Sequence, residues 1–327
     1  MKPPLTRADI AARTADLSSL ADAGTPDALM ALLRLLHAVG RHDLPLGRLF
    51  EGHVDALQIV ARYGTPAQRA VSEAAAREGA AFGVWNADLP GEPLVVDGDR
   101  LSGGKAFASG AGLLSHALVS VDRDGRRQLL LLDLARTSPA VDRSWWRVTG
   151  MQRSETHLVR WKDAPIPPDA WIGAPGAYIR EPFFSGGAIR FAAVQAGGIA
   201  GVVDRVRDHL VAHDRHRDAI QRGRLADLFG AAQAAAGAVR HAAQRWSVED
   251  IPATLALVAA ARAAVYSAGE TVLTLAQAAV GVQAMFVDHP LAGQLTDLTV
   301  YLRQPAPDLQ RDRVGEAVAA GLLSPAL

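Results

Sequence analysis

Residues 281–315, GVQAMFVDHPLAGQLTDLTVYLRQPAPDLQRDRVG, follow a long alanine-rich region and decide how the end of the chain folds. Four leucines after Pro290 recur at helical spacing, which predicts one amphipathic helix with this proline in its first turn. They are Leu291, Leu295, Leu298 and Leu302. Pro305 and Pro307 then end the helix, because proline lacks a backbone donor and disfavours helix in the residue before it. The loop after this helix is where we look for functional residues.

The composition excludes several classes of function. The chain has 327 residues, 34 basic and 34 acidic side chains and 49% hydrophobic residues, enough for a core in one to three domains. A net charge of zero gives no electrostatic reason to expect nucleic acid or a membrane as partner. The absence of cysteine excludes disulfides and thiolate chemistry, and we expect a cytoplasmic protein. No signal-peptide core and no apolar run of about 20 residues is apparent.

The local patterns predict three regions and an α+β fold. Residues 1–80 read as an N-terminal α-helical domain, in which Thr65 and Pro66 mark a helix start. Residues 81–173 alternate short apolar runs with turn residues, which is typical of a small β-barrel-like domain. The pairs Asp97-Gly98 and Asp124-Gly125 predict hairpins.

The third region, residues 174–327, is predicted to be a C-terminal four-helix bundle. Its helical patterns cover residues 190–213, 222–244, 251–279 and 291–303. Alanine is abundant in them, so the helices can approach one another closely. We assign packing, and no chemistry, to these small residues.

Several segments resemble acyl-CoA dehydrogenases, in the order in which that family has them. Gly281, His289-Pro290 and Asp297 fit the last helical segment, and LFEGHVDALQIVARYGTPAQR (residues 49–69) is similar to the end of the N-terminal domain. The stretch before the last strands is also similar, with Gly150, Arg153, Ser154 and Thr156 in place. The resemblance covers most of residues 47–315 and implies the family's three-part fold, with a shortened N-terminal domain.

The resemblance also implies FAD as cofactor. GDRLSGGKAFASGAG (residues 98–112) resembles the family's Gly-x-Lys-x-Trp-Ile-Thr-Asn-Gly segment, with Phe107 for the tryptophan and Ser109 for the threonine. By this resemblance Phe107 covers the isoalloxazine ring and Ser109 hydrogen-bonds to it. Taken alone, the two residues are more typical of a core residue and a turn residue. The order of the neighbouring segments favours the flavin.

Four further residues are expected at the cofactor. Trp85 and Asn86 stand where the family has backbone contacts to the flavin, although its following Gly-Ser element is missing here. Gly281 belongs to the glycine-rich turn. Arg217 corresponds to an arginine that binds the pyrophosphate of the partner subunit's FAD, a task that suits the guanidinium fork; Gln221 or Arg224 are the alternatives. The implied assembly is a homodimer or homotetramer.

The catalytic base of the family is missing. Pro305 occupies the position of the glutamate that takes the substrate's alpha proton, and the alternative site falls on Arg190 or Phe191. The remaining candidate for a relocated base is Asp308. His289 is more simply a packing residue.

Three functions therefore stay open. The first is an FAD enzyme that oxidises an acyl-CoA or another acyl thioester at its alpha-beta bond with a relocated base. The second is a flavin-dependent monooxygenase or oxidase, in which no base at Pro305 is needed. The third is a non-catalytic relative that serves binding or assembly. The ten histidines show no HExxH or paired spacing, so no metal is expected.

Overall fold

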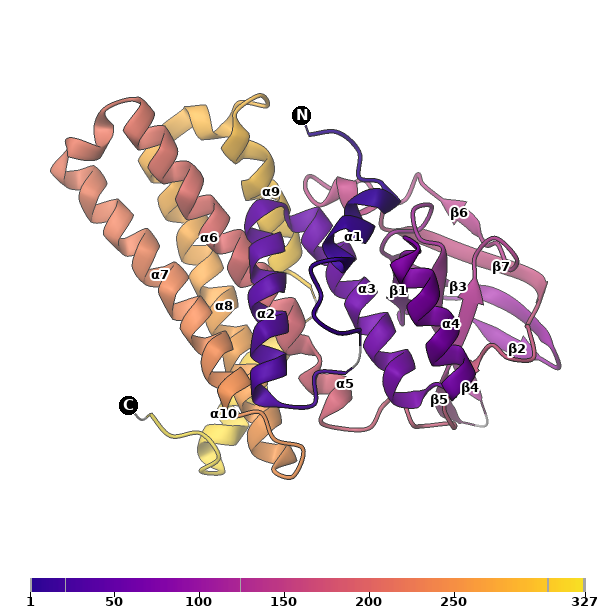
Figure 1. The fold of residues 1–327 in the computed structure, drawn as a ribbon. Helices are drawn as coiled ribbons and strands as arrows, with labels where there is room; N and C mark the ends of the chain where they lie inside the picture. The colour runs from indigo at the N-terminus through magenta and orange to yellow at the C-terminus, as the bar shows by residue number, and fades with distance from the viewer. Residues whose placement is uncertain (1, 21, 124, 305, 326–327) are drawn as a thin grey trace.

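The computed structural model describes residues 2–20, 22–123, 125–304 and 306–325. Along the chain, helices precede and follow a region of strands, which confirms the predicted α+β order. In space the strands lie at one side of the molecule, with the N-terminal helices between them and the long C-terminal helices (Figure 1). One cluster of buried side chains runs from Leu5 to Leu302 through all three regions. The boundaries at residues 80 and 173 stay predictions, although the strands do lie between Phe82 and Ile172.

The N-terminal region consists of four helices. They are α1 (Arg7–Thr14), α2 (Pro26–His42), α3 (Leu44–Tyr63) and α4 (Pro66–Arg77). The predicted start of α4 is confirmed: Thr65 is its N-cap and its hydroxyl accepts a hydrogen bond from the backbone of Gln68 at 3.2 Å. Nearly every residue of α3 from Leu44 to Val60 is buried, so this helix has protein around its whole circumference.

The strands form two four-stranded sheets, with the orders β1-β4-β5-β8 and β2-β3-β7-β6. Their bounds are β1 (Phe82–Trp85), β2 (Val95–Asp97), β3 (Arg100–Ala108), β4 (His116–Arg123), β5 (Arg126–Asp133), β6 (Ala140–Asp142), β7 (His157–Pro165) and β8 (Trp171–Ile172). Both predicted hairpins are confirmed, since β2 pairs antiparallel with β3 and β4 with β5. Gly98 has the positive φ of +57° that its turn requires. Asp124 lies outside the described residues.

The C-terminal region is helical. Its helices are α5 (Phe183–Gly186), α6 (Ala188–Ala212), α7 (Ala219–Gln244), α8 (Ile251–Val280), α9 (Pro290–Leu302) and α10 (Pro307–Ala319), and short 3-10 turns lie at η1 (Gln152–Ser154), η2 (Arg215–Arg217) and η3 (Gly281–Met285). The predicted amphipathic helix is confirmed, because Pro290 begins α9 and its four leucines are all buried. Helix α10 was not predicted. Pro307 was expected to stop a helix but occupies the first turn of a new one, where no backbone donor is needed.

Helix α2 packs against α6 and so joins the N-terminal region to the C-terminal helices (Figure 1). The contact is close enough to require glycine on both helices. A Cβ on Gly197 would lie 2.1 Å from the carbonyl oxygen of His37, and one on Gly40 would lie 2.3 Å from that of Val194. These glycines therefore set the distance between the two regions.

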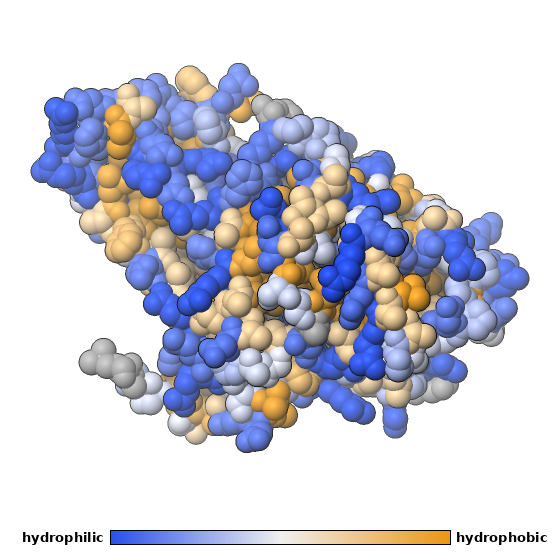
Figure 2. Space-filling model, viewed as in Figure 1, coloured by the Kyte–Doolittle hydropathy of each residue, from blue (hydrophilic) through white to orange (hydrophobic). Residues whose placement is uncertain are grey.

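Two helical segments, Phe183–Ala212 and Ile251–Met285, are long and apolar enough to cross a membrane by length and composition. The sequence analysis did not expect such segments. In the structure 72% of the first window and 44% of the second are buried inside the protein, and a core helix passes the same test. Figure 2 shows a mainly hydrophilic face with hydrophobic side chains gathered over the helices at its centre and left.

Candidate functional site

A cavity of about 550 Å³ lies where the three regions of the chain meet. Helix α3 lines one side, and the ends of β1 and β3 line another. Helices α5 and α6 and the residues after α9 complete it. Its volume is within the range of about 300–1,000 Å³ that is usual for small-molecule sites.

Phe107 lines this cavity because the strand that carries it is bulged. The pairing of β3 with β7 shifts register between Lys105 and Ala108, and Phe107 there has a φ of +52°. A bulge turns a side chain away from the regular alternation of a strand. The ring is 48% exposed and stands edge-on to Trp145, with 4.9 Å between the ring centroids. Phe107 is therefore an accessible aromatic ring and no core residue.

Ser109, two residues further on, also lines the cavity. Its hydroxyl oxygen accepts a hydrogen bond from Thr156 at 3.1 Å, so its own proton is available to an acceptor in the cavity. Trp85 is only 1% exposed and does not line the cavity. Its indole nitrogen donates to the carbonyl oxygen of Ser109 at 3.0 Å. Trp85 therefore supports the Ser109 backbone from behind.

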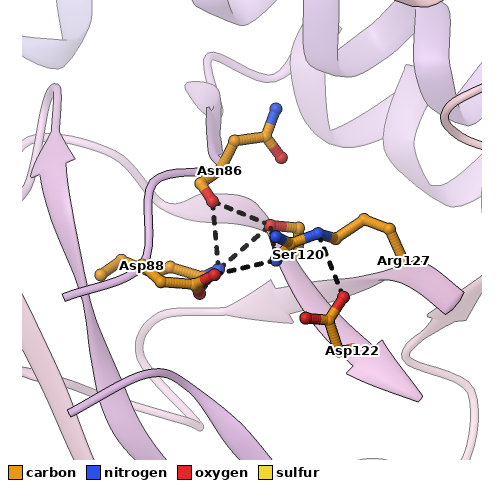
Figure 3. A network of polar contacts seen from close by, with 6 residues as sticks. Asn86, Asp88, Ser120, Asp122 and Arg127 are labelled. Carbon is orange, nitrogen blue, oxygen red and sulfur yellow. Dashed lines mark hydrogen bonds and ion pairs between the residues drawn. The ribbon is translucent and has the colours of Figure 1, made fainter. Parts of the chain in front are cut away.

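Asn86 lines the cavity and donates from its side-chain amide to the hydroxyl of Tyr178. A polar network holds its backbone in place (Figure 3). The Asn86 carbonyl oxygen accepts hydrogen bonds from the Lys105 ammonium at 3.3 Å and from the Ser120 hydroxyl at 3.1 Å. Lys105 is fully buried and pairs with Asp88 at 2.5 Å. We call Asn86, Phe107 and Ser109 the β wall of the cavity.

Charge balance in this network is maintained by a second cation. Burial lowers the pKa of Lys105, although the Asp88 carboxylate opposes this shift. Burial alone would raise the pKa of Asp88, but Lys105 and Arg127 hold it below its ordinary value. Arg127 lies 3.1 Å from Asp88 and also pairs with Asp122 (Figure 3). The network thus fixes the segment that carries Asn86.

The opposite side of the cavity is charged, and we call Arg48, Glu51, Asp55 and Arg190 the helical wall. Arg48 donates to Glu51 at 2.7 Å on α3. Arg190 of α6 pairs with Asp55 and donates to the side-chain oxygen of Gln58 at 3.2 Å. Glu51 and Arg190 are 6% and 9% exposed. Burial raises the pKa of Glu51, and Arg48 opposes that shift.

Arg48, Glu51 and Asp55 were not predicted as site residues from the sequence. A signal was present, because they share one face of α3 at helical spacing. The helix is otherwise rich in apolar residues around its circumference, so these charges had to be buried or to line a cavity. Arg190 was considered from the sequence only as a possible position of the catalytic base, and it was rejected because it is not an acid.

Besides Trp85, three further predicted site residues do not line the cavity of their own chain. Arg217 is in η2, where its side chain is 76% exposed and lies 3.2 Å from Asp214. Gly281 ends α8 with a φ of +80°. The Asp308 side chain is 94% exposed and does not line the cavity, so it is not placed to act as a base there. Pro305 lies outside the described residues.

Described residues at or next to both expected base positions line this cavity. Arg303 and Gln304, just before Pro305, line it, and so do Arg190 and Phe191. None of these four is an acid. Among the cavity-lining residues that the structure describes, the carboxylates are Glu51 and Asp55.

Two other residues of the sequence analysis have structural roles. His53 is fully buried, accepts a hydrogen bond from the backbone of Phe82 at 3.1 Å and contacts the Thr14 hydroxyl at 2.9 Å. Burial lowers its pKa to about 4, so it is neutral. His289 caps α9 and contacts His209 at 3.2 Å. Within the described ranges, no group of three or more potential ligands could hold a metal ion.

No protein-family model and no curated protein matches the sequence. Solved structures match nearly the whole chain. TdsC, a dibenzothiophene monooxygenase from Paenibacillus sp. A11-2, was solved with FMN and indole; it has a TM-score of 0.80 and 17% identity over 96% of this chain and 94% of TdsC.

Two more structures share the fold. KijD3, solved with FMN and dTDP-3-amino-2,3,6-trideoxy-4-keto-3-methyl-D-glucose, has a TM-score of 0.77 and 20% identity over 97% of this chain and 86% of KijD3. Butyryl-CoA dehydrogenase from Megasphaera elsdenii has a TM-score of 0.73 and 16% identity, over 89% of this chain and 82% of the dehydrogenase. The chain therefore has the acyl-CoA dehydrogenase-like fold, in a sequence that has diverged far from these three proteins.

Proposed function

We propose that the protein binds a flavin in this cavity and is a flavin-dependent monooxygenase or oxidase. The observation that carries the proposal is the β wall: Phe107 and Ser109, which the sequence resemblance assigns to the flavin, line the same cavity. Asn86 joins them there.

The residues present fit a flavin. The exposed ring of Phe107 offers an apolar face for the isoalloxazine, and aromatic rings stack favourably. The Ser109 hydroxyl has a proton to donate to a ring nitrogen or oxygen. The backbone carbonyls of Asn86 and Ser109 both accept partly buried hydrogen bonds, so their positions are fixed before a ligand arrives.

We favour a reaction with dioxygen over thioester oxidation because the catalytic base of the family is missing. Removal of an alpha proton needs a carboxylate at the reacting carbon. Neither base position of the family carries an acid here. A reduced flavin held by the β wall would supply the two electrons and two protons with which one atom of dioxygen enters the substrate and the other leaves as water. TdsC, which matches nearly the full length, is named as such a monooxygenase.

The chain's own residues then have distinct tasks. The β wall orients the flavin ring, and the helical wall binds the polar part of the substrate. Phe183, Phe184 and Phe191 contribute apolar surface that excludes water from the space between.

The visible spectrum tests the proposal. Purified protein is titrated with FMN and with FAD, since the complexes of TdsC and KijD3 contain FMN while the sequence resemblance implies FAD. The expected result is the absorbance spectrum of a protein-bound flavin. After reduction, the flavin-loaded protein should consume dioxygen. A protein that takes up neither flavin would exclude both enzyme functions and leave the binding or assembly role.

Oxidation of an acyl thioester is the second candidate, and one observation favours it. Glu51 is a buried carboxylate in the cavity, and its raised pKa suits a proton acceptor. Anaerobic bleaching of the bound flavin by butyryl-CoA, lost in Glu51→Gln, would establish this reaction. The absence of bleaching with acyl-CoAs of all chain lengths favours the dioxygen reaction.

Assembly and location complete the proposal. A homodimer or homotetramer in the cytoplasm is proposed from the sequence. Arg217 is exposed and does not line its own chain's cavity, which supports a role toward a neighbouring subunit. Sedimentation of the flavin-loaded protein measures the assembly.

A further inference from the structure

The arginines that line the cavity are already paired with carboxylates. Arg48 pairs with Glu51, and Arg190 with Asp55. The formal charges of the helical wall therefore cancel. An ion brought to this wall would be desolvated without a free counter-charge, which is unfavourable.

The other two cavity-lining arginines are also paired with carboxylates. Arg62 donates to Asp22 at 2.9 Å, and Arg303 donates to Glu270 at 2.6 Å. Both acids lie outside the cavity lining. Among the lining residues that the structure describes, the four arginines thus provide a polar surface without an unpaired positive charge, which disfavours carboxylates and phosphates as buried ligands.

One donor in the helical wall has no partner. Arg190 is 9% exposed, and its Nε is buried without a hydrogen bond, although its two other nitrogens bind Asp55 and Gln58. A buried N–H without an acceptor carries a free-energy penalty of about 1–3 kcal/mol. Other atoms of Arg190 line the cavity, so a shift of the guanidinium toward the cavity would bring this donor to a ligand oxygen and remove that penalty.

Much of the remaining surface of the cavity is apolar, and the part beside Arg190 is aromatic. Phe183, Phe184 and Phe191 line it beside Arg190, and Tyr178 stands edge-on to Phe184 with 5.2 Å between the ring centroids. A flat apolar ring fits such a surface, whereas a flexible alkyl chain would also have to cover the charged face of α3.

From these contacts we infer that the substrate is a compact, uncharged molecule with one aromatic or other flat apolar face and one neutral oxygen acceptor, bound by Arg190. This inference adds a substrate class to the proposed function. It rests on that function in one respect: the flavin occupies the β wall and leaves the helical wall to the substrate. It goes further by excluding ionic and fatty-acyl groups from the buried end of the site.

The test uses three probes of nearly equal size: benzamide is neutral, benzoate is an anion and benzylamine is a cation. Their affinities for the flavin-loaded protein are measured by isothermal titration calorimetry at neutral pH. Benzamide is expected to bind at least about tenfold more tightly than either ion. Equal or tighter binding of benzoate or benzylamine overturns the inference, and so does the absence of benzamide saturation in the millimolar range.

A variant then tests the role of Arg190. Arg190→Lys keeps the positive charge beside Asp55 and removes the Nε donor. The affinity for benzamide should therefore fall about tenfold, and the ratio of benzamide affinity to benzoate affinity should decrease. Arg41→Lys is the matched control, because Arg41 pairs with Asp204 at 2.6 Å outside the cavity lining. Unchanged benzamide affinity in a folded Arg190→Lys protein contradicts the assignment.

Failure of the proposed function would be visible separately. Flavin absorbance reports cofactor binding alone. If the protein binds neither FMN nor FAD, the same three probes are titrated into the flavin-free protein, and their order of affinity still decides the part of the inference that concerns the charge of the ligand. The wild-type comparison also does not depend on any variant folding.

Discussion

The two walls of the cavity are built in opposite ways. The β wall comes mainly from one continuous stretch, in which a bulge exposes Phe107 and leaves Ser109 with a free proton. The helical wall joins α3 to α6 through Arg190 and Asp55, which are 135 residues apart, and it consists of partly buried ion pairs. The difference suggests a division of work, with an uncharged wall for a flat cofactor and a charge-balanced wall for a polar substrate.

Removing one ion from the helical wall should have the largest effect. Arg190→Ala leaves the Asp55 carboxylate without its partner, so the free energy of unfolding should fall by about 3–5 kcal/mol. Urea denaturation followed by circular dichroism measures this loss.

The double variant Arg190→Met with Asp55→Leu is the control, because it removes both charges and keeps apolar volume. It should recover most of the lost stability. If Arg190→Ala unfolds within about 1 kcal/mol of the wild type, the helical wall is open to water and the contrast between the walls disappears.

The same contrast explains what the sequence could reveal. Helical spacing predicted α9, turn pairs predicted both hairpins, and the stretch around Phe107 and Ser109 was found because its residues are contiguous. The ion pair between α3 and α6 has no local pattern, because only the packing of α3 between other elements brings its partners together. Helix α10 was missed because the same residue, Pro307, can stop one helix or begin the next.

Asp297 tests the junction between the β region and α9. Its carboxylate accepts a hydrogen bond from the backbone of Met151, and burial raises its pKa from 3.8 to about 6. Between these two values the folded state binds more protons than the unfolded state, so this group stabilises the fold as pH falls through the window. Above pH 6 the folded state carries the full penalty of the buried charge.

Asp297→Asn should therefore be more stable than the wild type at neutral pH, by about 1–3 kcal/mol, and the difference should vanish below a pH of about 4. Asparagine retains an oxygen for the Met151 donor. Unfolding of both proteins across this pH range measures the effect. A less stable variant at neutral pH would mean that the charged hydrogen bond to Met151 outweighs the penalty of burial.

A smaller effect is expected on the β wall, in ligand affinity and not in stability. Phe107→Ala removes the ring proposed to stack on the flavin, so flavin affinity should fall about tenfold. Stability should change by less than about 1 kcal/mol, because the ring is half exposed. Fluorescence titration with flavin is the measurement, and Phe229→Ala, an exposed ring on α7 outside the cavity lining, is the control. Equal losses in both variants would contradict the assignment of Phe107.

The smallest change in stability is expected at Arg217. Its side chain is 76% exposed and its ion pair with Asp214 is at the surface, so Arg217→Ala should alter the free energy of unfolding by no more than about 0.5 kcal/mol. The informative measurement is again flavin affinity, which the sequence resemblance expects to fall. Because Arg217 lies outside the cavity of its own chain, such a fall must come from a neighbouring subunit, and it should disappear on dilution to monomers. An unchanged affinity at every protein concentration would show that the two walls of one chain bind the flavin without help.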